Sequence, residues 1–102
     1  MSANPLRGEA ELEVAGTRLR LRPTFERLVA AEAELGPLFA LVDRAADGRL
    51  GLGELAALLW HCLDERPAGL ERAGFGEALV AGGLAAALGP ARAILAQVLK
   101  GR

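Results

Sequence analysis

The amino-acid sequence predicts an α+β, mostly helical domain in which an N-terminal two-stranded antiparallel β-hairpin packs on four to five short α-helices. Apolar and charged residues alternate over residues 9–22, which is typical of half-buried strands. From residue 24 onward apolar residues recur at helical spacing, and glycines and prolines divide this part into short segments. A length of 102 residues fits one domain. We therefore expect a loose leader over residues 1–8 and a single domain over residues 9–102, with the helical part at 24–102.

The two strands of the expected hairpin carry opposite charges. With Ala15 and Gly16 as a two-residue loop, one face of the hairpin is apolar, and its largest side chains are Leu12, Val14, Leu19 and Leu21. The other face pairs each glutamate with an arginine: Glu9 with Arg22, Glu11 with Arg20 and Glu13 with Arg18. A shift of one residue would disrupt both faces, so the two faces select the same register. Ala15 is an unusual residue for this loop, because a type I′ turn needs a positive φ there.

Five helical segments are expected after the hairpin. They lie at about residues 24–36, 37–48, 51–66, 71–81 and 84–99. Thr24 can cap the first segment, and Pro37 suits the first turn of the second. Gly74 and Gly76 weaken the fourth. The last segment keeps one helical phase across Gly89-Pro90, which predicts a kinked or restarted helix there.

In two of these segments the apolar residues recur at helical spacing and so share one face of the helix. In the first helix the apolar residues at helical spacing are Phe25, Leu28, Val29, Ala31 and Leu35. In the third they are Leu52, Leu55, Leu58, Leu59 and Cys62. Aromatic residues make up only 4% of the chain, so leucine, valine and alanine must supply most of the core.

Residues 43–54 approach the 12-residue EF-hand calcium loop. The ligands would be the side chains of Asp43, Asp47 and Glu54 and the carbonyl of Arg49. Ala45 and Gly51 offer no side-chain oxygen at loop positions 3 and 9, which leaves about five protein oxygens where calcium prefers six to eight. The simpler interpretation is a connection between two helices in which Asp47-Gly48 is only a turn. We therefore expect no metal, and keep calcium as the alternative.

The sequence gives little indication of a catalytic site, a disulfide, or binding to nucleic acid or membranes. His61 and Cys62 are adjacent on a helix, so their side chains point about 100° apart and cannot form a catalytic pair. A single cysteine excludes an internal disulfide and fits a reducing compartment. The formal net charge of -1 gives no general attraction to nucleic acid or to a membrane surface, and no stretch nears the ~20 apolar residues of a membrane span. We expect a cytoplasmic protein that is not an enzyme and has no cofactor.

The order of features over residues 7 to 100 resembles the small tail proteins of gene transfer agents and related siphophages. The segments that carry the resemblance are GEAELEV (8–14), GTRLRLR (16–22), FERLVAAEAELG (25–36), GRLGLGELAALLW (48–60) and GGLAAAL (82–88). That family is usually described as phage tail assembly chaperones or minor tail proteins. The resemblance implies a non-catalytic protein of the bacterial host cytoplasm that binds a tape-measure or tail tube protein as an assembly chaperone. The alternatives are a structural minor tail or tail tube component retained in the particle, and an EF-hand-like calcium-binding module.

The apolar face of the hairpin is the candidate partner-binding surface. A solitary two-stranded hairpin is marginal in water, so Leu12, Val14, Leu19 and Leu21 must be covered by the protein's own helices or by another subunit. An exposed strand edge can also add to a neighbour's sheet. We therefore expect strand pairing or packing, and not charge, to carry any contact, either with a tail protein or in a homo-oligomer.

Overall fold

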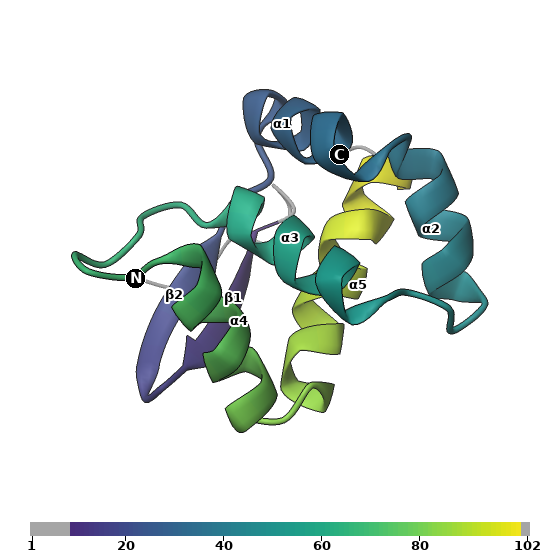
Figure 1. Cartoon of the computed structure of the whole chain (residues 1–102). Helices are drawn as coiled ribbons and strands as arrows, with labels where there is room; N and C mark the ends of the chain where they lie inside the picture. The colour runs from purple at the N-terminus through teal and green to yellow at the C-terminus, as the bar shows by residue number, and fades with distance from the viewer. Residues whose placement is uncertain (1–8, 101–102) are drawn as a thin grey trace.

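A computed structural model describes residues 9–100 of the chain. Its elements in order are β1 (Ala10–Val14), β2 (Thr17–Leu21), α1 (Phe25–Leu35), α2 (Leu38–Ala46), α3 (Leu52–Cys62), α4 (Arg72–Ala81) and α5 (Ala85–Lys100). The predicted fold class, mostly helical α+β with an N-terminal antiparallel hairpin, is confirmed (Figure 1). The leader expected over residues 1–8 lies outside the described residues.

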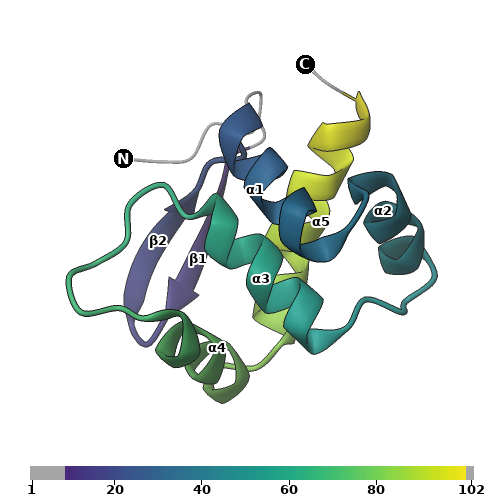
Figure 2. The ribbon, with the colours of Figure 1, turned by 45° about the horizontal axis from the view of Figure 1, so that its top comes forward.

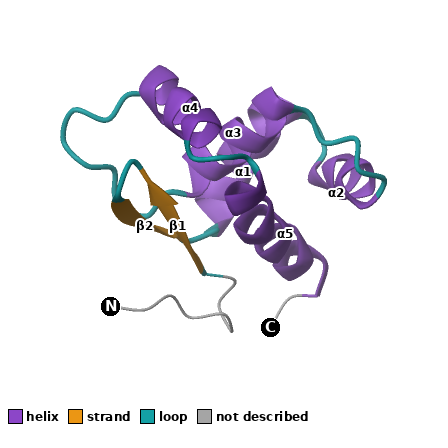
Figure 3. Ribbon diagram, turned by 90° about the horizontal axis from the view of Figure 1, so that it is seen from below, coloured by secondary structure: helices purple, strands orange, loops and turns teal. Residues whose placement is uncertain are grey.

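The helix α3 lies at the centre of the fold. Three other helices, α1, α4 and α5, pack against it, and the hairpin contacts α5 and α4 through β1 (Figure 2). The hairpin and α2 lie on opposite sides of these central helices (Figure 3). Leu58 and Leu59 of α3 are fully buried, as are Phe75 of α4 and Ile94 of α5. The core therefore forms where these three helices meet.

The hairpin has the predicted register. Leu12 lies opposite Leu19 and Val14 opposite Thr17. The two loop residues have φ values of 51° at Ala15 and 79° at Gly16, so both adopt the left-handed conformation that a type I′ turn requires. Such a φ is uncommon for alanine because its Cβ crowds the backbone. The twist and register of the strands thus impose a backbone conformation that the residue itself does not favour.

A short segment after α3 covers part of the outer edge of β2. The Arg22 amide donates to the Cys62 carbonyl (2.7 Å), and the Asp64 amide donates to the Arg20 carbonyl (2.9 Å). An isolated antiparallel bridge between Leu21 and Leu63 lies between these two bonds. The second half of β2 is therefore hydrogen-bonded on both sides, which ties the hairpin to the end of α3.

The expected apolar faces of α1 and α3 are only partly buried. On α1 only Ala31 is fully buried, whereas Phe25 is 82% exposed and Val29 is 47% exposed. On α3 the predicted face is buried except for Leu52, which is 49% exposed at the start of the helix. Phe25, Val29 and Leu52 thus lie at helical spacing with buried residues but do not belong to the core. The helix α1 is covered on one side only, and Leu52 borders an open hollow between the start of α3 and α5.

The last segment is one helix, not a helix that restarts. The helix α5 continues through Pro90 from Ala85 to Lys100. Proline has no amide hydrogen, so the carbonyl of Ala86 loses its helical partner at this point. Among the described residues no single helix is long and apolar enough to span a membrane, and α4 and α5, which together reach that length and apolarity, meet at a bend of 118°.

Candidate functional site

A cluster of two arginines and one aspartate joins the hairpin, α1 and the loop after α3. Arg20 donates from Nε (3.0 Å) and Nη2 (2.5 Å) to Oδ2 of Asp64, and Arg27 donates from Nη1 to Oδ1 of Asp64 (3.2 Å). Arg27 also donates to the carbonyls of Arg22 and Asp64. The hydrogen bond from Arg20, reinforced by that from Arg27, lowers the pKa of Asp64 below its ordinary value. The cluster thus holds the loop after α3 beside β2.

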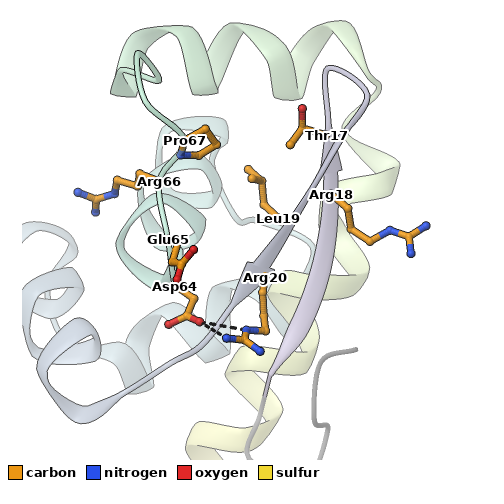
Figure 4. Close-up of a pocket in the computed structure, with 8 residues that line it drawn as sticks. All are labelled: Thr17, Arg18, Leu19, Arg20, Asp64, Glu65, Arg66 and Pro67. Carbon is orange, nitrogen blue, oxygen red and sulfur yellow. Dashed lines mark hydrogen bonds and ion pairs between the residues drawn. The ribbon is translucent and has the colours of Figure 1, made fainter. Parts of the chain in front are cut away.

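An open groove lies between the first half of β2 and this loop. It has a volume of about 430 Å³ and is lined by Thr17, Arg18, Leu19, Arg20, Asp64, Glu65, Arg66 and Pro67 (Figure 4). In Figure 4 the side chain of Arg20 points toward Asp64, whereas that of Arg18 points away from the loop. After the hydrogen bond from the Asp64 amide to the Arg20 carbonyl, the loop therefore turns away from β2. The edge of the first half of β2 faces solvent.

Arg18 is the residue whose backbone opens onto this groove. Arg20 and Arg22 use an outward carbonyl and an outward amide to bind the segment after α3. Backbone groups of alternate residues point the same way in an antiparallel strand, so the amide and carbonyl of Arg18 also point outward. Neither group has a backbone partner within residues 9–100. Such an edge is a template for pairing with another strand.

The apolar face of the hairpin is covered by the chain's own helices. The predicted partner-binding residues Leu12, Val14, Leu19 and Leu21 are at most 6% exposed and belong to the main hydrophobic core. The apolar face is therefore covered by the protein's own helices and not by another subunit. A partner that meets the folded chain at the hairpin contacts its edge or its charged face, and not these four side chains.

The charged face of the hairpin has the expected register, but two of its arginines, Arg18 and Arg20, form ion pairs with residues other than the ones opposite them. Arg22 forms the expected ion pair with Glu9 (3.6 Å), whereas Arg18 lies nearest the diagonal residue Glu11 (3.9 Å). Arg20 lies opposite Glu11 in the register, but its ion pair is with Asp64. The predicted Glu11–Arg20 pairing in the register is confirmed, and Asp64 adds an ion pair to Arg20 from the segment after α3.

Two of the three acidic residues of the calcium-like loop, Asp47 and Glu54, are held by arginines. Glu54 forms an ion pair with Arg44 and accepts a hydrogen bond from the Gly51 amide (2.9 Å), which caps α3. The Gly51 bond, together with Arg44, lowers the pKa of Glu54. Asp47 forms an ion pair with Arg49 (3.0 Å). Within residues 9–100, no group of three or more histidine, cysteine or acidic side chains is placed to hold a metal ion.

We expect millimolar calcium to leave the melting temperature unchanged. Two of the three acidic side chains of the loop, those of Asp47 and Glu54, would have to leave an arginine before they could bind the ion. A ligand that bound the folded chain would raise its stability in proportion to the logarithm of the ligand concentration. Thermal melts at several calcium concentrations measure this, with magnesium as the control. A rise specific to calcium would restore the EF-hand-like alternative.

His61 and Cys62 have separate surroundings, as expected. His61 Nε2 lies 2.9 Å from Oε1 of Glu34. Glu34 also forms an ion pair with Arg72, so that one carboxylate joins α1, α3 and α4. Cys62 is fully buried, and this burial raises the pKa of its thiol to about 12. The thiol is therefore a core side chain and not a nucleophile.

We expect Glu34 to contribute to the pH dependence of stability in acid. Hydrogen bonds from Arg72 and His61 lower its pKa from 4.5 to about 2 in the folded chain. A lowered folded pKa means that the contribution is complete above about pH 4.5 and is lost as the pH falls toward about 2. Melting temperatures of the wild type and Glu34→Gln, measured between about pH 6 and 2, should therefore converge at the acid end. Two curves that stay parallel through this range would contradict the assignment.

The sequence alone could not identify the cluster of Arg20, Arg27 and Asp64. Asp64 lies 44 positions from Arg20 and 37 from Arg27, so no local spacing connects them. The weak signal was a polar stretch, residues 64–66, immediately after an apolar helix. The alternating arginines were visible in the sequence, but the partner of Arg20 came from outside the hairpin.

Comparison with known proteins gives a match to a protein family. Residues 7–101 match the family model described as "Phage tail tube protein, GTA-gp10". This range includes both strands and all the helices. No curated protein and no solved structure gives a significant match. The resemblance to tail proteins of gene transfer agents and phages is confirmed, while the description names a tube protein and not an assembly chaperone.

Proposed function

Because the chain belongs to the phage tail tube protein family GTA-gp10, we propose that it is a structural subunit of a phage-like tail that acts by contact with other tail proteins. The family match, which extends over residues 7–101, is the observation that carries this proposal. A tail component retained in the particle agrees better with that description than an assembly chaperone does. In this role the chain is not an enzyme and needs no cofactor.

The open edge of β2 supports a role in which the chain binds another tail protein. Within residues 9–100, the outward amide and carbonyl of Arg18 have no backbone partner, and they lie beside an open groove. The loop after α3 holds this edge in place through Arg20, Arg27 and Asp64, so an incoming strand meets a preformed site. Main-chain hydrogen bonds would supply the affinity of such a contact, and the groove would select the side chains that fit. We propose that a strand of a neighbouring tail subunit pairs here.

The composition of purified particles tests the proposed role. Particles are isolated from the producing bacterium, and peptides of the chain are quantified by mass spectrometry in the particles and in the particle-free lysate. A tail subunit is expected in the particles, at a constant ratio to the other tail proteins. If the chain occurs only in the lysate, bound to a tape-measure or tube protein, it is an assembly chaperone, and the structural role is rejected.

Arg18→Pro is expected to reduce incorporation into particles strongly. Proline lacks the outward amide hydrogen, and an outward position at a strand edge tolerates it, so the hairpin itself should persist. Arg18→Ala, which removes the same side chain and keeps the amide, is the matched control and should be incorporated normally. The measurement is the amount of each variant per particle.

Circular dichroism and thermal melts show whether the proline variant is folded. Equal incorporation of the two folded variants would show that this edge is not used. Loss of incorporation with Arg18→Ala as well would assign the contact to the side chain and not to strand pairing.

A further inference from the structure

Two of the apolar surfaces that the described residues leave uncovered lie at different places on the chain. The first, the α1 ridge, consists of Phe25, Val29 and the neighbouring Glu26. Phe25 is 82% exposed and Val29 is 47% exposed, and residues four apart lie on one face of a helix. Apolar side chains that gather on a surface mark a site of interaction.

The second surface, the leucine groove, is a hollow of about 290 Å³ between the α2–α3 connection and α5. The leucines that line it are Leu50, Leu52, Leu55, Leu84, Leu88 and Leu95. Leu52 and Leu84 are 49% and 36% exposed at its rim. A bulky exposed side chain on one partner and a leucine-lined hollow on the other are the parts of an interface anchor and its pocket.

The charges beside these surfaces are complementary. On the α1 ridge, Arg22 and Arg27 already pair with Glu9 and Asp64, whereas Glu26 has no ion pair within residues 9–100. Arg44 and Arg49, which are next in sequence to lining residues of the leucine groove, likewise pair with the acidic residues Glu54 and Asp47. Arg92, an exposed lining residue of the groove, has no ion pair in this part of the chain. Each surface thus has one charge without an ion pair, and the two charges have opposite signs.

We propose that the α1 ridge of one copy docks into the leucine groove of a second copy, with Phe25 as the anchor and Glu26 beside Arg92. The ridge and the groove are different surfaces, and Figure 1 shows α1 at the top of the fold and the α4–α5 turn, which carries Leu84, at the bottom. Docking therefore leaves a free ridge on one copy and a free groove on the other. A contact of this kind repeats and builds a ring or a filament. The inference rests on the proposed tail role and names the partner and the surfaces used.

Cross-linking of two variants tests whether the contact joins unlike surfaces. Val29→Cys, which keeps the Phe25 anchor, and Leu84→Cys are made in the full chain, with an affinity tag on one of them. Cys62 is buried and inert, so only the introduced thiols react with a short bismaleimide. The mixture is expected to give the mixed dimer, and each variant alone is expected to stay uncross-linked. Ala73→Cys, at an exposed position on α4 outside both surfaces, replaces Leu84→Cys in the control mixture and should give no product.

Charge reversal tests the pairing of Glu26 with Arg92. Glu26→Arg and Arg92→Glu should each weaken association by about tenfold or more, because each brings like charges together. The double variant Glu26→Arg/Arg92→Glu should restore it. Glu77→Arg, an exposed reversal on α4, should have no effect. Light scattering and sedimentation over a range of concentrations measure the mass of the assembly.

Three outcomes would overturn the contact. They are a wild-type chain that stays monomeric at all concentrations, Val29→Cys chains that cross-link to each other, and a double variant that associates no better than the single ones. These outcomes are separate from the test of the proposed role. If the chain is monomeric but occurs in purified particles, this contact is rejected and the tail role is kept. If the chain associates but is absent from particles, the tail role is rejected and the contact is kept.

Discussion

Phe75→Ala is expected to lower the free energy of unfolding by about 3–5 kcal/mol. Phe75 is fully buried, and its ring lies 5.6 Å from that of Trp60 in a tilted arrangement. It is one of two buried side chains of α4, the other being Leu79. Two glycines flank Phe75, and glycine is about 1 kcal/mol less favourable than alanine within a helix. The helix α4 therefore depends on packing of this ring to stay formed.

Chemical denaturation and thermal melts measure this effect. A domain of this size is stable by about 5–15 kcal/mol in total, so we expect the melting temperature to fall by more than about 10 °C. The matched control is Phe39→Ala on α2, where the ring is 66% exposed and the loss should stay within about 0.5 kcal/mol. Similar losses for the two variants would show that α4 is not anchored through Phe75.

Asp64→Ala is expected to destabilise the fold by about 2–3 kcal/mol. The carboxylate accepts hydrogen bonds from two arginines, and hydrogen bonds to charged groups contribute about 1.5–3 kcal/mol. The Asp64 side chain is 12% exposed and those of its partners about 30%, so solvent screens the ion pairs only in part. Without the carboxylate both guanidinium groups lose their shared acceptor. The loop after α3 then loses side-chain support at the edge of β2.

Urea denaturation of Asp64→Ala and Asp64→Asn separates the charge from the hydrogen bonds. Asparagine keeps one acceptor oxygen, so its loss should be smaller than that of alanine. Asp43→Ala is the control, because Asp43 is an exposed carboxylate without an ion pair in the described part of the chain. The pKa of Asp64 is lowered by folding, so its contribution is present above about pH 3.8 and is lost in more acid solution. A difference from the wild type that persists undiminished at low pH would reject the ionic origin.

The elements of this fold follow mainly from local patterns in the sequence. The alternation of apolar and charged residues fixes both strands, and the two faces agree on a single register, so the pairing of Leu12 with Leu19 was predictable. The expected range of α4, residues 71–81, differs from the observed helix by one residue at its start. Glycines and prolines separate α1 from α2 and α4 from α5 as expected, but α3 ends at Cys62, before the expected break at Pro67, and Pro90 does not interrupt α5.

The side of each helix that is covered was not predictable from the sequence. Phe25, Val29 and Leu52 lie at helical spacing with core residues, and yet they are exposed. Periodicity shows that a helix has an apolar face, but it does not show how much of that face a neighbouring element covers. The exposed remainder of the apolar faces of α1 and α3 is part of the α1 ridge and of the leucine groove.

What the sequence determined by itself is the hairpin, its register, the succession of helices and the family of tail proteins to which the chain belongs. Only the tertiary structure decided how the hairpin is used. It buries the four apolar side chains of the hairpin against α4 and α5, and brings Asp64 to Arg20 across 44 positions. It also leaves the backbone of Arg18 open. Register depends on residues that are near each other in the sequence. Burial and the exposure of a strand edge depend on which distant segments contact each other, and the local spacing of residues does not indicate those contacts.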